Sequence, residues 1–112
     1  MDLLGKYGID VSVAQAGLTW ADYSAASPEI SFAFIRSGVF YANSFEQDSE
    51  VTNNIDALDG HIPIGFYFVP HGENSVGFFN QGAIFANWVK NTYVTPKGKS
   101  PQLPFMIDIE TG

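Results

Sequence analysis

Apolar residues in this chain fall into four short runs, and stretches of helical periodicity separate them. The runs cover residues 7–13, 30–36, 62–69 and 103–110. The first run alternates apolar and polar residues, as a strand with one covered face does. The second, which includes Phe32-Ala33-Phe34-Ile35, is almost continuously apolar, as in a strand buried on both faces. We therefore predict four short strands.

Three stretches between these runs favour helices. Residues 19–26 begin with Thr19, a suitable N-cap, and residues 48–58 carry Val51, Ile55 and Leu58 at helical spacing. The third stretch starts at residue 74 or 75 and continues to about residue 90, whereas residues 93–102, with two prolines and one glycine, predict a loop. Strand–helix alternation of this kind is typical of a parallel sheet, so we predict an α/β chain with the order β-α-β-α-β-α-β.

Polar side chains lie on each predicted strand, mostly towards its end. Asp10 is on the first strand, Arg36 ends the second, Tyr67 is late in the third, and Asp108 and Glu110 end the fourth. The two acids of the fourth strand are two positions apart, so they point to the same face. Functional residues of parallel α/β folds gather at the C-terminal ends of the strands. We therefore expect these five side chains to converge on one pocket.

Composition narrows the possible functions. The 112 residues suit one domain, and the 46% of hydrophobic residues predicts a packed core. A net charge of −7 argues against a nucleic-acid partner, which requires basic patches. The absence of cysteine excludes disulfides and thiolate metal sites, and two scattered histidines do not make a zinc motif. No signal peptide is visible, and no apolar run reaches the ~20 residues of a membrane span.

The ordered set of these residues resembles the N-terminal half of the family 25 glycoside hydrolases, the muramidases or lysozymes of bacteria, fungi and phages. The resemblance is carried by Gly8-Ile9-Asp10-Val11-Ser12, Gln15, Trp20, Phe32-Ala33-Phe34-Ile35-Arg36, the series Asp48, Val51 and Asn54, Gly65-Phe66-Tyr67, Gln81, Phe85, and Leu103-Pro104 through Asp108-Ile109-Glu110. Two positions depart from the family pattern. Phe68 stands where a histidine is usual, which removes a polar group from near the expected pocket, and Ala16 stands where a glycine often follows the glutamine.

The resemblance implies a fold, a reaction and roles. Residues 1–112 would form a single partial domain, the first half of an irregular TIM-like barrel. The reaction would be cleavage of the β-1,4 bond between N-acetylmuramic acid and N-acetylglucosamine in peptidoglycan, with no cofactor and no metal. Glu110 would be the general acid and then the base, Asp108 would stay ionised beside it, and Asp10 would lie across the pocket. Tyr67 and Arg36 would contact substrate, although a core position for Tyr67 and a structural ion pair for Arg36 remain open.

A half-barrel of four strands leaves the edges of its first and last strands unpaired, and such edges recruit other chains. Its inner faces, for which we expect Phe32, Phe34, Phe66, Phe68 and Met106, would lose the opposite wall of the core. We therefore predict, besides the glycan strands, a second chain or a second copy that completes the barrel. Without a signal peptide, delivery to the cell wall would depend on a holin, a phage particle or lysis.

Two alternatives stay open. Asp108-Ile109-Glu110-Thr111 also resembles the first metal-binding motif of proofreading exonucleases, which place such a strand first and use two divalent ions. A non-catalytic role, as a structural or docking piece of a phage tail or of a wall-associated assembly, is the stronger rival.

Overall fold

A sheet of five strands forms the centre of the protein. The computed structural model describes residues 7–27, 29–41, 44–72 and 75–108. The strands are β1 (Tyr7–Val11), β2 (Ile30–Tyr41), β3 (Ser44–Gln47), β4 (Ile64–Val69) and β5 (Met106–Ile107). Their order across the sheet is β1-β2-β4-β5, all parallel, and β3 adds antiparallel to the end of β2.

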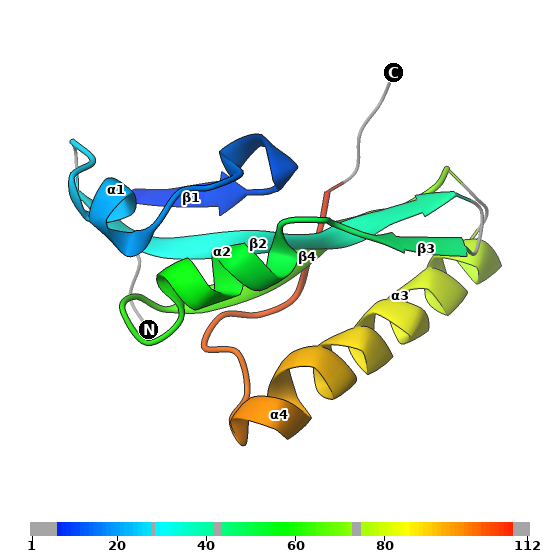
Figure 1. Ribbon diagram of the computed structural model, residues 1–112. Helices are drawn as coiled ribbons and strands as arrows, with labels where there is room; N and C mark the ends of the chain where they lie inside the picture. The colour runs from blue at the N-terminus through cyan, green and yellow to red at the C-terminus, as the bar shows by residue number, and fades with distance from the viewer. Residues whose placement is uncertain (1–6, 28, 42–43, 73–74, 109–112) are drawn as a thin grey trace.

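Helices connect the parallel strands. They are α1 (Trp20–Ser24), α2 (Val51–Leu58) and α3 (Ser75–Val89), with α4 (Thr95–Lys97) following α3. The strand order advances in one direction, and crossovers between parallel strands are almost always right-handed, so the connecting helices gather on one face of the sheet. Figure 1 shows α2 and α3 along the same side. The predicted α/β architecture with a parallel sheet is confirmed, and it is consistent with part of a TIM-like barrel.

The two faces of the sheet differ sharply in burial. On the helix-covered face, Ile35 and Phe66 have no exposed surface and Phe68 is 2% exposed. The opposite surface, which we call the open face, carries Asp10, Phe32, Phe34, Arg36, Tyr67 and Met106, all of them half-buried or exposed. The expectation that Phe66 and Phe68 lie on an uncovered inner face is therefore wrong. Both pack under the helices, where Phe68 contacts Phe85 with 4.6 Å between ring centroids.

Strand β2 continues well beyond Arg36, where the sequence predicted its end. The pairing register with β4 shifts between Arg36 and Gly38, which leaves Ser37 as a bulge. The extra residue moves the alternation by one position, so Phe40 joins the core at 4% exposure while Tyr41 emerges on the open face at 61%.

The strand β3 that pairs with this extension was not predicted. Phe40 faces Phe45 and Val39 faces Glu46 across an antiparallel hairpin. Gly38 lies so close to the carbonyl oxygen of Glu46 and the ring of Phe45 that a Cβ would collide with both. The Ser37-Gly38 pair, which in the sequence favours the end of a strand, is instead the feature that lets the strand bend and continue.

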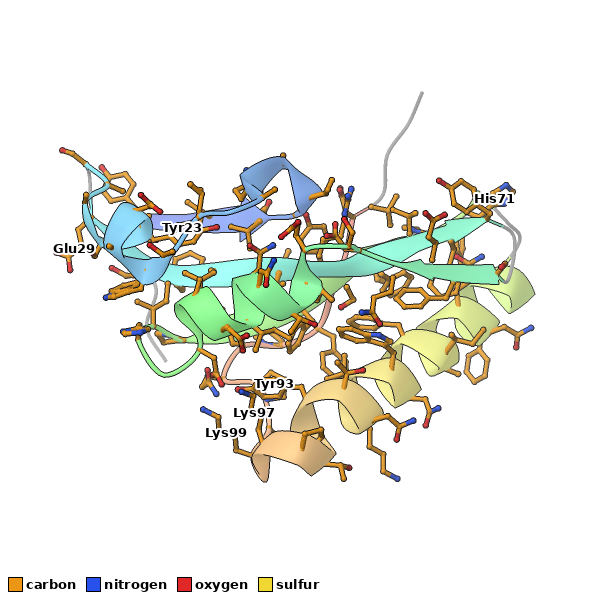
Figure 2. All side chains as sticks on the ribbon, in the orientation of Figure 1. Tyr23, Glu29, His71, Tyr93, Lys97 and Lys99 are labelled. Atoms are coloured by element: carbon orange, nitrogen blue, oxygen red, sulfur yellow. The ribbon has the colours of Figure 1, made fainter. Side chains whose placement is uncertain are left out.

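The loop predicted for residues 93–102 is also partly wrong. A π-helical turn (Lys90–Val94) leads from α3 into α4, and Gly98 ends α4 with a φ of 70°. Tyr93 lies inside the core with no exposed surface; its hydroxyl donates to Asp59 Oδ1 at 2.8 Å, and Lys99 Nζ contacts the same oxygen at 3.1 Å. Figure 2 shows Tyr93 and Lys99 close together near α4. Pro96 therefore did not prevent a helical turn, since it lies at the start of α4, whereas Pro101 follows after the helix has ended.

The last predicted strand begins later in the structure than the sequence indicated. Among residues 103–108, the described part of the predicted range, Met106–Ile107 pairs with β4 as a strand. Leu103 is buried instead at the start of β4, where its backbone N–H donates to the carbonyl of Ile64 at 3.1 Å. Residues 109–112 lie outside the described part of the chain.

Candidate functional site

Three of the five predicted site residues line one small cleft on the open face. Asp10, Tyr67 and Asp108 surround a cavity of about 90 Å³, whose remaining walls are Phe34, Met106 and Ile107. Strand register explains the grouping, since Asp10 pairs with Phe34 on β2, and Tyr67 pairs with Met106 on β5. Each of the four parallel strands, or the residue just after it, thus contributes at least one side chain to the cleft.

Asp108 is held in place by its own backbone. Its N–H donates to the carbonyl of Phe68 at 2.9 Å, which continues the pairing with β4 beyond β5. Glu110, the predicted general acid, lies outside the described residues, so its position and role stay predictions.

Tyr67 is a neutral phenol among charged groups. Its pKa is raised to about 12, chiefly because burial disfavours the phenolate. The nearby guanidinium of Arg36 lowers the pKa, whereas the carboxylates of Asp10, Asp108 and Asp48 raise it. At neutral pH the hydroxyl therefore keeps its proton, and the cleft offers a hydrogen-bond donor beside two carboxylates.

Arg36 forms an ion pair next to this cleft. Its Nε donates to Asp48 Oδ2 at 2.8 Å, and the Asp48 side chain is fully buried while that of Arg36 is 25% exposed. The same carboxylate accepts the N–H of Val13 at 3.1 Å and, through Oδ1, the N–H of Glu50 at 2.8 Å. This geometry gives Arg36 a structural partner, and leaves its outer guanidinium nitrogens without one among the described residues.

Asp48 and Asn54 are the positions that sequence analysis named only as a family pattern. Asn54 is buried; its side-chain amide donates to the carbonyl of Ser12 at 3.2 Å and its Oδ1 accepts from the hydroxyl of Tyr23 at 3.5 Å. Together Asp48 and Asn54 hold α2 and the turn before it against residues 12 and 13. These two residues directly follow β1, the strand that carries Asp10. Their Asp-x-x-apolar-x-x-Asn spacing was the signal available in the sequence. In the structure these two side chains position the chain that follows β1.

Phe68, which the sequence comparison placed where the resembled family usually has a histidine, does not border the cleft. Its side chain points to the helix-covered face and its ring lies against Phe40 and Phe85, with the Phe40 centroid at 5.4 Å. Phe68 is therefore part of the core, and the expectation that this position lies near the pocket is wrong for the cleft described above.

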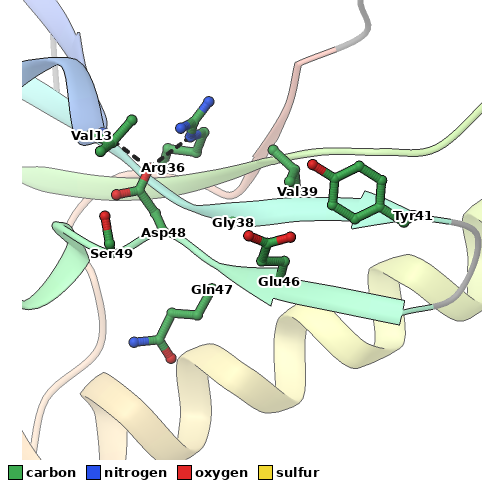
Figure 3. A pocket seen from close by; sticks show the side chains of 9 residues that line it. All are labelled: Val13, Arg36, Gly38, Val39, Tyr41, Glu46, Gln47, Asp48 and Ser49. Atoms are coloured by element: carbon green, nitrogen blue, oxygen red, sulfur yellow. Dashed lines mark hydrogen bonds and ion pairs between the residues drawn. The ribbon is translucent and has the colours of Figure 1, made fainter.

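A larger cleft of about 330 Å³ lies beside the first, where the β2–β3 hairpin meets the turn after β1. Figure 3 shows the side chains that line it, including Arg36, Tyr41, Glu46 and Asp48. We call it the hairpin cleft. Arg36 borders it, and Tyr67 is the cross-strand partner of Arg36, so the two clefts are neighbours. This cleft was not predicted from the sequence, because the hairpin that forms it was not predicted.

The described residues hold no group of three or more His, Asp or Glu side chains arranged to bind a metal ion. Within the same part of the chain, no helix is long and apolar enough to cross a membrane.

Comparison with solved structures identifies a similar fold. The modular autolysin LytC from Streptococcus pneumoniae, in complex with a synthetic peptidoglycan ligand, superposes with a TM-score of 0.71 and 22% identity over 92% of this chain and 22% of that chain. A second structure of the same autolysin gives 0.69 and 22% over 89% and 21%. This likeness shows the fold, and the chain spans about a fifth of the length of those proteins. No protein-family model and no curated protein sequence matches it.

Proposed function

We propose that this chain is the first part of a peptidoglycan-hydrolysing barrel that cleaves the β-1,4 bond between N-acetylmuramic acid and N-acetylglucosamine. The observation that carries the proposal is the grouping of Asp10, Tyr67 and Asp108 around one cleft at strand ends. The fold shared with an autolysin supports it. In this proposal the enzyme is encoded by a phage or a bacterium and reaches the wall through a holin, a phage particle or lysis.

Each of the four predicted residues Glu110, Asp108, Asp10 and Tyr67 has a task in the proposed reaction. Glu110 protonates the leaving oxygen and then activates water, as one of the paired carboxyl groups of a glycosidase does. Asp108 stabilises positive charge at the anomeric carbon or orients the acetamido group of the substrate. Asp10 holds substrate from the opposite side of the cleft, and the protonated Tyr67 donates a hydrogen bond.

In this proposal the site needs additional polypeptide to be complete, supplied by a further segment, a second chain or a second copy. The edge strand β5 is exposed on both faces, since Met106 is 45% and Ile107 54% exposed. Phe105, whose ring packs on Phe85 of α3, is 49% exposed, and Phe79 on α3 is 78% exposed. Strands that pair with β5 and a helix that covers α3 would bury all four side chains.

Product analysis tests the reaction. The native protein, with any chain that co-purifies, is incubated with purified peptidoglycan, and the new reducing ends are converted to sugar alcohols and identified by mass spectrometry. We expect muramitol, because the muramic acid residue gains the free anomeric carbon. Glu110→Gln should lower the rate by ~10²–10⁴-fold, since an amide cannot donate the proton. Glu29→Gln is the matched control, because Glu29 is exposed and lies just before β2, outside both clefts.

Other results would redirect the proposal. Glucosaminitol as the product would indicate cleavage of the alternate bond, and a fully active Glu110→Gln variant would remove that residue from the mechanism. Binding of glycan without any hydrolysis, even with the co-purifying chain, would favour the non-catalytic docking role. Magnesium-dependent nuclease activity would favour the exonuclease reading of the last strand.

A further inference from the structure

The bulge at Ser37 places the hairpin cleft on the same face of the sheet as the proposed catalytic cleft. If Ser37 occupied a regular paired position in place of the bulge, Val39 and Tyr41 would alternate onto the helix-covered face, and Phe40 would point outward. With it, Val39, Tyr41 and their cross-strand neighbour Glu46 join Arg36 on the open face. The two clefts therefore follow one another along β2, in a line that a linear polymer can occupy.

The lining of the hairpin cleft is chemically mixed. Tyr41 presents an aromatic ring that is 61% exposed, and Val13 and Val39 supply apolar contacts. The polar groups are the outer N–H groups of Arg36, which donate, and the carboxylate of Glu46, which accepts. Figure 3 shows Tyr41 and Glu46 lying over the same stretch of the hairpin. An apolar and aromatic wall with a few oriented polar groups is typical of small-molecule sites, whose volumes are roughly 300–1,000 Å³.

The charges select a neutral, amide-bearing ligand. Asp48 already neutralises Arg36 through a 2.8 Å contact to Nε, and Glu46 adds one further negative charge. An anionic group would meet that carboxylate, whereas an acetamido group can accept from Arg36 with its oxygen and donate to Glu46 with its N–H. The pyranose ring attached to it can lie with its C–H bonds against the ring of Tyr41.

We propose that the hairpin cleft is an additional subsite for one N-acetylated sugar residue of the same glycan strand. The inference rests on the proposed function, because it extends the glycan from the cleft of Asp10, Tyr67 and Asp108 along β2. The volume of about 330 Å³ admits one sugar ring, whereas the neighbouring cleft of about 90 Å³ is too small to enclose one. The larger cleft therefore supplies most of the contact area for the chain, and the smaller one holds the reacting bond.

Oligosaccharide length tests this assignment. N-acetylglucosamine dimers and tetramers, which carry the acetamido groups of the glycan, are titrated into the protein and followed by calorimetry and by NMR. We expect the tetramer to bind about tenfold more tightly than the dimer. Tyr41→Ala and Glu46→Gln should each remove most of that advantage and leave dimer binding unchanged. Tyr7→Ala, at another exposed tyrosine (59%) that opens β1 and lines neither cleft, is the control and should change neither affinity.

The outcomes separate the two proposals. Equal binding of dimer and tetramer, or variants that bind the tetramer as tightly as the parent, would overturn the subsite and leave the catalytic cleft intact. Loss of dimer binding in Asp10→Asn, with tetramer shifts still centred on Tyr41 and Glu46, would support both sites. Absence of binding by either sugar would overturn the subsite, while muramitol production would still decide the reaction. Far-UV circular dichroism establishes that Tyr41→Ala is folded.

Discussion

The helix-covered face and the open face belong to the same strands, yet they show different kinds of organisation. The covered face is closely packed: Phe66 lies between Trp88 and Tyr93, with ring centroids at 5.7 and 5.3 Å. The open face carries charged side chains, two clefts and half-exposed phenylalanines. Side chains alternate between the two faces along each strand. Those on the covered face stabilise the fold, and those on the open face are available to contact a ligand. A substitution on the covered face should matter through the volume of the side chain, and one on the open face through its charge and hydrogen-bonding groups.

The largest effect should come from emptying the covered face. Phe66→Ala removes a fully buried ring, and we expect it to lower the free energy of unfolding by about 3–5 kcal/mol. Phe32→Ala, on the open face, is the matched control; it should cost much less, because its half-buried ring packs mainly on Phe34, with the ring centroids 6.1 Å apart, and over Gly8. Urea denaturation measures both. Equal losses would mean that the open face is covered in solution, as a bound partner would cause.

The next effect concerns the buried carboxylate of Asp48, which holds Arg36 of the open face. Asp48→Ala leaves the N–H groups of Val13 and Glu50 without their acceptor and Arg36 without its partner. We expect a loss of about 2–3 kcal/mol, less than for a fully buried pair because Arg36 is partly exposed. Arg36→Ala should cost a similar or smaller amount, since the two N–H groups still neutralise the carboxylate in part. Denaturation of the single and double variants yields the coupling between them, and a coupling near zero would contradict the ion pair as a structural link.

The smallest effect appears only at alkaline pH. The pKa of Tyr67 is raised to about 12 in the folded chain, whereas an unfolded tyrosine titrates near 10. Between about pH 10 and 12 the unfolded state loses this proton while the native state keeps it, so stability falls as pH rises through that window and is unaffected below it. Tyr67→Phe should therefore flatten the decline, by less than about 1 kcal/mol because the site is partly solvated.

The pH dependence is measured by urea unfolding at a series of pH values, and the absorbance of tyrosinate reports the titration itself. Some decline should remain in the variant, because burial also raises the pKa of Tyr23 and Tyr93. An identical slope in parent and variant would show that Tyr67 is fully solvated, and so would place it outside the cleft.

The sequence predicted the parallel strands because their apolar runs are bounded by clear helical stretches. It could not predict the hairpin, because Ser37-Gly38 carries the same signal whether a strand ends or bulges, and only the pairing with β3 decides between them. The helical turn over residues 90–97 was missed because proline is tolerated early in a helix, a position the local sequence does not reveal.

For the site, the sequence identified Asp10, Tyr67 and Asp108 by their place on successive strands, and the structure brings these three together. Their catalytic roles, and the position of Glu110, stay predictions. The partner of Arg36 was not predicted, because Asp48 is twelve residues away in sequence and reaches Arg36 only through the hairpin. Which face Phe66 and Phe68 occupy was also beyond the sequence, since a strand that is apolar throughout does not reveal which side the helices cover.

The single bulged serine has a consequence for how this part of the protein can change over generations. Because the pairing with β4 skips Ser37, deleting that residue would close the bulge and leave Phe40 in the core and Tyr41 on the open face, as they are now. A one-residue insertion between Gly38 and Phe40 would instead shift the alternation, so that Phe40 turned to solvent and Tyr41 turned inward. The strand should therefore tolerate the loss of its bulged residue far better than an added residue farther along the hairpin.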